Sequence, residues 1–183
     1  MSKDNSKLKK YDDVINLIKS KNYKDAEISL VNVVKDEKND FYPHQLLGIV
    51  YSKLGDLNKA ISHFEISFKI NPKNPGVIFN LGMIYLEQGN LDKSKEFFFK
   101  TVELDKNFTE GYLNLAKVFE KQQNFIESDK FYQKALSINN KYLPAIRSYS
   151  NFLINIGEIS KALSYQYKYF GIIKFNNDKP EIT

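Results

Sequence analysis

Leu47-Gly48-Ile49-Val50-Tyr51, followed by Gly55, is the stretch that decides the fold, because it returns along the chain at a constant interval. It recurs 34 residues later as LGMIY at 81–85, followed by Gly89, and again as LAKVF at 115–119. A period of this length indicates supersecondary units that cannot bury their apolar faces alone and therefore stack on their neighbours. The sequence thus predicts an array of repeats.

Extending this register in both directions without insertion divides the 183-residue chain into five units. A polar tail precedes them at 1–6, and a second tail follows them at 177–183. The five predicted units are 7–40, 41–74, 75–108, 109–142 and 143–176.

Each unit carries two blocks of apolar or small residues at three- and four-residue spacing, which is typical of one face of an amphipathic helix. In the unit 41–74 the blocks are Leu47, Gly48, Tyr51 and then Ala60, Phe64, Ser67. Each unit is therefore predicted to be a pair of helices. We expect the aromatic positions of these faces to form the core, namely Tyr51, Tyr85, Phe119, Phe64, Phe98 and Tyr132.

The turn between paired helices has its own pattern, a glycine followed by a capping residue. Gly55-Asp56 and Gly89-Asn90 follow it, since glycine can adopt the left-handed conformation that ends a helix and Asp or Asn can cap the next one. Lys21-Asn22 and Gln123-Asn124 lack the glycine, so these turns are expected to be less favourable.

These residues resemble the tetratricopeptide repeat family, whose 34-residue unit is a helix-turn-helix. The unit 41–74 is the most similar, with Leu47, Gly48, Tyr51, Gly55, Ala60, Phe64 and Pro72 at matching positions. The first and last units match more weakly. The resemblance implies an all-α, right-handed superhelical solenoid of about five repeats.

The resemblance also implies a binding groove, because the first helix of each pair lines a concave face in this family. Asn80 and Asn114 share one repeat position, and an Asn amide can both donate to and accept from a peptide main chain. The alternative is that both amides are simply solvated. The predicted groove residues are Tyr42, Gln45, Ile49, Phe79, Asn80, Met83, Leu113, Asn114, Lys117, Arg147, Ser148 and Asn151.

Composition argues against catalysis and cofactors. The chain has no cysteine, only two histidines, His44 and His63, and no glycine-rich phosphate loop or nucleophile motif. We therefore expect no catalytic residue, no metal site, no cofactor and no enzymatic activity. The histidines fall in different predicted helices and are expected to be ordinary boundary residues.

The net charge of +5 does not indicate nucleic acid, because Arg147 is the only arginine and guanine recognition favours arginine. The start of the chain is polar and lacks a signal sequence. No apolar run approaches the roughly 20 residues that cross a bilayer. We expect a cytoplasmic protein that binds neither nucleic acid nor membrane.

The C-terminal end departs from the repeat pattern. Aromatic and β-branched residues crowd 165–175, Gly171 interrupts a helix there, and Tyr167 to Phe175 reads partly as a strand. Three explanations stay open: a longer parent chain, pairing of the last helix with another copy or partner, and folding back onto the array.

The sequence predicts a non-catalytic protein-interaction module or scaffold that binds a peptide or a partner's helix in its concave groove. The alternative is the substrate-recruiting N-terminal region of a longer enzyme, of transferase or hydroxylase type, whose catalytic domain is absent here. The identity of the protein partner does not follow from the sequence.

Overall fold

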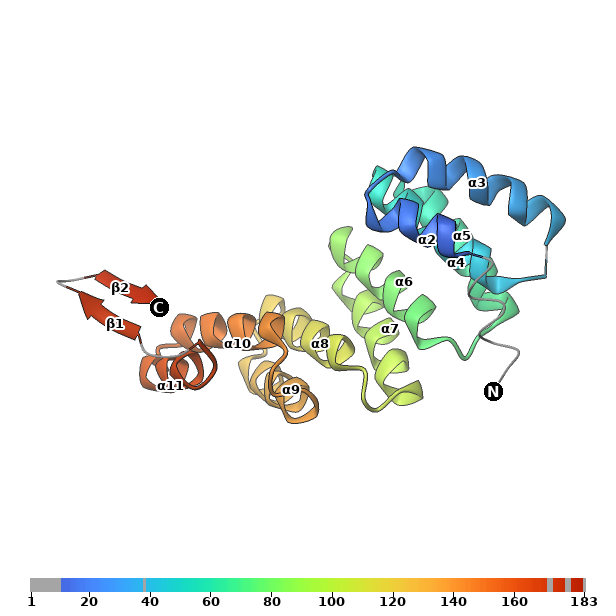
Figure 1. Cartoon of the computed structure of the whole chain (residues 1–183). Coiled ribbons are helices and arrows are strands. Elements are labelled where there is room, and N and C mark those ends of the chain that lie inside the picture. Colours follow the sequence, from blue (N-terminus) through green and yellow to red (C-terminus); the bar gives the residue numbers. More distant parts are fainter. Residues whose placement is uncertain (1–10, 38, 171–172, 177–178, 183) are drawn as a thin grey trace. The chain divides into compact units, whose positions relative to one another are not determined.

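A computed structural model describes residues 11–37, 39–170, 173–176 and 179–182 (Figure 1). Ten helices and two strands lie in these ranges. The helices are α2 (Asp12–Lys19), α3 (Tyr23–Asp36), α4 (Phe41–Leu54), α5 (Leu57–Ile70), α6 (Pro75–Glu87), α7 (Leu91–Leu104), α8 (Thr109–Lys121), α9 (Phe125–Ile138), α10 (Leu143–Asn155) and α11 (Ile159–Phe170). The strands are β1 (Ile173–Asn176) and β2 (Lys179–Ile182).

The predicted all-α repeat fold is confirmed, since every 34-residue interval holds two helices that follow each other closely. The helices belong to two compact units, Met1–Lys100 and Thr101–Thr183, with the boundary inside α7. The first unit holds α2 to α6 and most of α7. The second holds the end of α7, the pairs α8–α9 and α10–α11, and the strands.

The turns inside the helix pairs use left-handed backbone at one residue each. Gly55, Gly89 and Gly157 have φ of 82°, 75° and 86°, and Lys21 and Gln123 adopt the same region with φ of 62° and 59°. A side chain in this region crowds the following carbonyl, so the two turns without glycine carry the strain that the sequence predicted.

Replacing Gln123 with glycine is expected to stabilise the second unit by about 0.5–1 kcal/mol, because glycine adopts positive φ without that steric cost. Urea unfolding followed by circular dichroism measures the change. Gly89→Gln is the converse control and should destabilise the protein, although nothing lies within 4 Å of a Cβ added there. A Gln123→Gly variant that is less stable than the wild type would contradict the backbone argument.

The α4–α5, α6–α7 and α8–α9 pairs each have a small residue on the first helix where the two helices meet. A Cβ added at Gly48 would lie 2.6 Å from the Phe64 ring, and one at Gly82 would lie 2.7 Å from Phe98. The α8–α9 pair has Ala116 and Tyr132 at the equivalent positions. Phe64, Phe98 and Tyr132 are at most 1% exposed, so these three aromatic residues form the core as predicted.

The other three predicted core rings are less enclosed. Tyr51 is buried, whereas Tyr85 and Phe119 are only partly buried. Their rings lie flat against Phe97 and Phe131, with centroids 5.4 and 5.3 Å apart. The prediction of a full core position was wrong for Tyr85 and Phe119, because a flat stack covers one face of a ring and leaves its rim accessible.

The C-terminal end is partly helix and partly strand. Tyr167 belongs to α11, and β1 begins only at Ile173 and pairs antiparallel with β2, with Ile173 opposite Ile182. The strand-like interpretation of 167–175 is therefore right only for its last residues. Gly171 and the tail 1–6 lie outside the described residues. None of the described helices combines the length and apolarity needed to cross a membrane.

Candidate functional site

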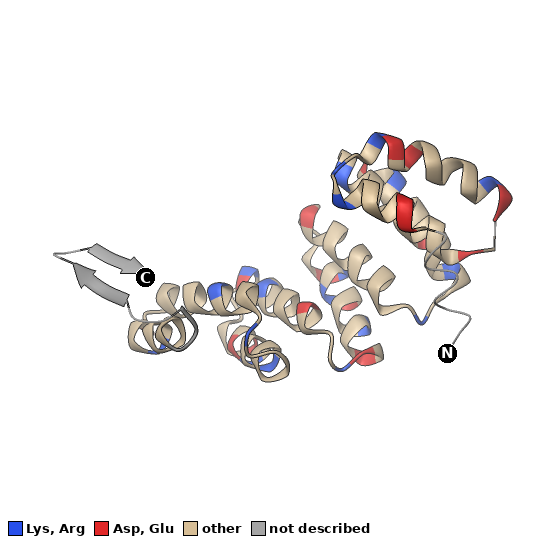
Figure 2. Ribbon diagram, in the orientation of Figure 1, with Lys and Arg blue, Asp and Glu red and all other residues tan. Residues whose placement is uncertain are grey.

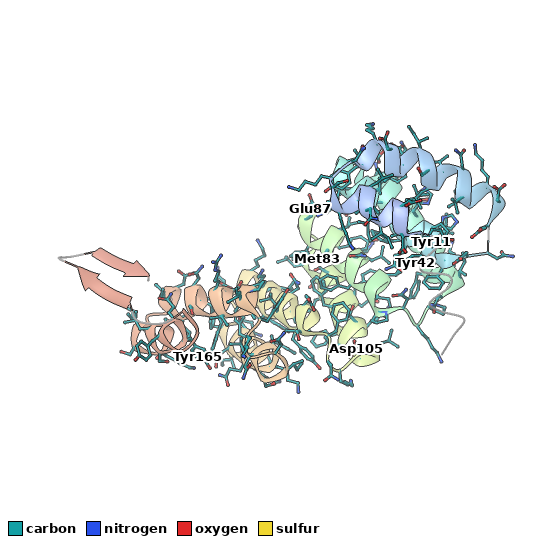
Figure 3. The ribbon with its side chains drawn as sticks, in the orientation of Figure 1. Tyr11, Tyr42, Met83, Glu87, Asp105 and Tyr165 are labelled. Atoms are coloured by element: carbon teal, nitrogen blue, oxygen red, sulfur yellow. The ribbon has the colours of Figure 1, made fainter. Side chains whose placement is uncertain are left out.

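A pocket of about 500 Å³ lies in the first unit and is formed by α4, α5 and α6. Four of the predicted groove residues, Ile49, Phe79, Asn80 and Met83, line it together. Met83 and Glu87 project from α6 (Figure 3). The remaining lining residues are Ser52, Lys53, Phe64, Ile84, Leu86 and Glu87.

Helical spacing explains how the sequence builds this pocket. Ile49, Ser52 and Lys53 are three and four residues apart on α4 and therefore share one face of that helix. Residues at the same spacing on α6, from Phe79 to Glu87, form the facing wall. The buried ring of Phe64, held against Gly48, provides the floor.

The pocket combines an accessible apolar interior with a few polar groups. Met83 is 39% exposed, and Ile49 and Phe79 are partly buried. Within the described residues the Asn80 amide has no hydrogen-bond partner, so its donor and acceptor are available to a ligand. Lys53 and Glu87 are exposed at the rim and carry opposite charges.

Asn80 and Asn114 occupy the same repeat position but have different surroundings. Asn114 is only 7% exposed, and its Nδ2 donates to the Glu110 carbonyl oxygen of the same helix at 2.8 Å. The side-chain NH2 group of Asn114 therefore already donates a hydrogen bond within α8. The neighbouring Leu113 is buried, and burial lowers the pKa of Lys117.

The remaining predicted groove residues lie outside this pocket. Tyr42 packs edge-on against Tyr11 with ring centroids 5.2 Å apart (Figure 3). Gln45 accepts a hydrogen bond from the Asn74 Nδ2 atom at 3.0 Å. In the second unit, Arg147 and Asn151 are exposed and Ser148 is half-buried on α10.

Sequence reasoning missed Ser52, Ile84 and Leu86 as lining residues. Ser52 and Ile84 lie one helical turn or less from predicted groove positions, so continuing each helix face by a turn would have found them. In the described part of the chain, no group of three or more His, Asp or Glu side chains is arranged to hold a metal ion.

Comparison with known proteins supports the repeat assignment. Two family models for the tetratricopeptide repeat match the sequence, one over residues 51–118 and the other over 109–142. No curated protein matches the sequence.

Several solved structures share the fold. A crystal structure of MamA is 18% identical, with a TM-score of 0.72, and the match covers 84% of this chain and 90% of that one. PilF of Pseudomonas aeruginosa is 16% identical, with a TM-score of 0.81 and coverage of 96% and 80%. A MamA AMB-1 structure is 22% identical, with a TM-score of 0.67 and coverage of 90% of both chains. At these identities the likeness concerns the fold alone.

Proposed function

Because the chain belongs to the tetratricopeptide repeat family, we propose that it is a protein-interaction scaffold whose α4–α6 pocket holds an apolar side chain of a bound peptide or partner helix. The pocket carries the proposal, since it brings accessible apolar side chains next to an amide that has no partner within the described residues. No step of this proposal requires catalysis.

The apolar wall supplies the affinity. Transfer of one Leu, Met or Phe side chain from water into a pocket lined by Ile49, Phe79 and Met83 contributes about 1.5–3 kcal/mol. A single such contact corresponds to roughly a ten- to hundredfold change in dissociation constant. A tight complex therefore needs further contacts along the partner segment.

The polar groups orient the partner. Asn80 can accept from a main-chain N–H and donate to a carbonyl oxygen whatever the partner's side chains are. Lys53 and Glu87 at the rim favour a segment that carries charges of both signs. Lysines and acidic residues are interspersed over the helices of the first unit, which favours the same kind of partner (Figure 2).

Met83→Glu is expected to weaken peptide binding about tenfold or more, because it places a carboxylate inside the apolar pocket. The probes are peptides selected against the wild-type chain from a random displayed library, and fluorescence anisotropy measures their affinities. Asn80→Ala should weaken the same peptides through the loss of a main-chain hydrogen bond.

Ile126→Glu is the matched control, since Ile126 is an exposed apolar residue outside the pocket, and it should leave binding unchanged. Selected peptides that bind the Met83→Glu variant as tightly as the wild type would reject the pocket as the binding site.

A further inference from the structure

The two histidines of the chain meet at the contact between α4 and α5. The Nδ1 atom of His44 lies 3.0 Å from the Nδ1 atom of His63, and the ring centroids are 5.3 Å apart. If the two nitrogens point directly at each other, the centroid separation should equal the nitrogen–nitrogen distance plus the radius of each ring. The observed separation is close to that sum. The two nitrogens therefore point at each other, and one must carry a hydrogen while the other accepts it.

The space between the two nitrogens fits a proton and not a metal ion. An imidazole nitrogen binds zinc at about 2.0 Å, so an ion on the line between these atoms would need the rings to move apart. One proton satisfies the pair without any movement. If both Nδ1 atoms carry a hydrogen, two donors face each other and the hydrogen bond is lost.

The pair occupies repeat positions that are apolar or aromatic in the next two helix pairs. His63 stacks on Tyr51 with centroids 5.4 Å apart, and the same stack recurs as Tyr85–Phe97 and Phe119–Phe131. The positions equivalent to His44 are Ile78 and Tyr112. The α4–α5 pair thus places imidazoles at a contact that the α6–α7 and α8–α9 pairs build without them.

The surroundings of the pair disfavour added positive charge. Burial lowers the pKa of His44, which is 8% exposed, and the carboxylate of Asp40 before α4 opposes this shift only in part. Burial, together with the charges of His44 and Lys59, lowers the pKa of His63 to about 4.

Two carboxylates complete the charged environment. Asp56 holds the Lys59 Nζ at 3.2 Å, and Lys59 also lies over the Tyr51 ring, 5.0 Å from its centroid. Glu27 on α3 accepts a hydrogen bond from the Tyr51 hydroxyl. These carboxylates face Lys59 and Tyr51, and neither of them has a hydrogen bond with an imidazole.

We propose that the His44–His63 contact is an acid-sensitive latch that opens the α4–α5 helix pair, and with it one wall and the floor of the pocket, when both rings become protonated. Repeat arrays are stabilised by contacts within and between neighbouring units, so one pair can open without the whole chain unfolding. Ile49 and Phe64 then leave the pocket. This last consequence rests on the proposed function, whereas the opening of the helix pair does not.

The direction of the pH effect follows from proton linkage. In the unfolded chain His63 takes up a proton near its ordinary pKa of 6.5, whereas in the folded chain it does so only near 4. Between these values the unfolded state binds more protons, so acid favours unfolding. The contribution of the neutral His63 ring to the free energy of unfolding is fully present well above pH 6.5, and it is lost as the pH drops towards 4. From pH 7 to 4.5 the unfolding constant should rise roughly sixtyfold through His63 alone.

The test compares urea unfolding of the full chain at pH 7, 6, 5 and 4.5 with that of His63→Phe. Phenylalanine is the residue at the equivalent position of α7 and α9, so it fits the ring stack. We expect the wild type to lose stability in acid and the variant to lose much less. An equal acid loss in both proteins would overturn the proposal.

A ring-proton NMR titration of the wild type covers the case in which the variant does not fold. Coupled titration of the two histidines below their ordinary range, together with faster amide exchange in α4–α5 than in α8–α9, supports the latch. Independent titration near 6.5 would overturn it. Peptide binding by the Met83→Glu variant at neutral pH tests only the proposed binding pocket. The acid unfolding of the wild type tests only the histidine latch, so either proposal can fail while the other stands.

Discussion

Phe64→Ala is expected to lower the free energy of unfolding by about 3–5 kcal/mol, the range for removing a fully buried aromatic ring. Phe64 is 1% exposed, and three atoms of its ring lie within 2.8 Å of the position of a Cβ on Gly48. The glycine backbone cannot supply side-chain atoms to refill the cavity. The substitution also removes the pocket floor. Urea unfolding measures the first effect, and affinity for the selected peptides measures the second.

A double-mutant cycle with Gly48→Ala tests the reason for this loss. In the wild type the new methyl group overlaps the Phe64 ring and should cost about 1–3 kcal/mol. In the Phe64→Ala background it enters the cavity, so the double variant should be more stable than the sum of the two losses predicts. Strict additivity would show that the contact between Gly48 and Phe64 does not govern the packing of α4 against α5.

Sequence periodicity predicted this part of the structure well. A 34-residue register places Gly48 and Phe64 at fixed positions of a helix pair. A shift of 34 residues places Gly82 and Phe98 at the same positions of the next helix pair. The register depends only on the spacing of apolar residues, which the folded chain has to satisfy in every unit. The buried positions of Phe64 and Phe98 were therefore predictable from the sequence, whereas the partial burial of Tyr85 and Phe119 was not.

The candidate site was only partly predictable, because a repeat position gives a helix face but not the neighbours of a side chain. Asn80 and Asn114 are equivalent in the register, yet only Asn114 is buried and bonded to its own helix. The meeting of His44 and His63 depends on how α4 crosses α5, and residue spacing along one helix does not determine that.

The C-terminal end shows the same limit. Aromatic residues are compatible with both helix and strand, so the pattern from 167 to 175 left the boundary open. Tyr165 on α11 (Figure 3) packs edge-on against the ring of Tyr149 on α10, with ring centroids 4.9 Å apart. This contact joins two helices just before the ambiguous stretch, and residue types along the stretch do not reveal it.

Tyr132 is the second core ring whose removal should have a large effect. It is 1% exposed, and its ring lies 5.4 Å from those of both Tyr149 and Phe152. Its hydroxyl donates to the Glu120 carboxylate at 2.7 Å. The residue therefore ties α9 to α8 by a hydrogen bond and to α10 by ring packing.

Tyr132→Ala is expected to cost about 3–5 kcal/mol, whereas Tyr132→Phe, which keeps the ring, should cost about 1.5–3 kcal/mol through loss of the hydrogen bond to Glu120. Because repeat stability depends on neighbouring contacts, the loss should be local. Amide exchange should accelerate in α8, α9 and α10 and remain slow in α4 and α5. Equal acceleration in both compact units would show that the array unfolds as one cooperative body, and the same result would remove the basis for a helix pair that opens alone.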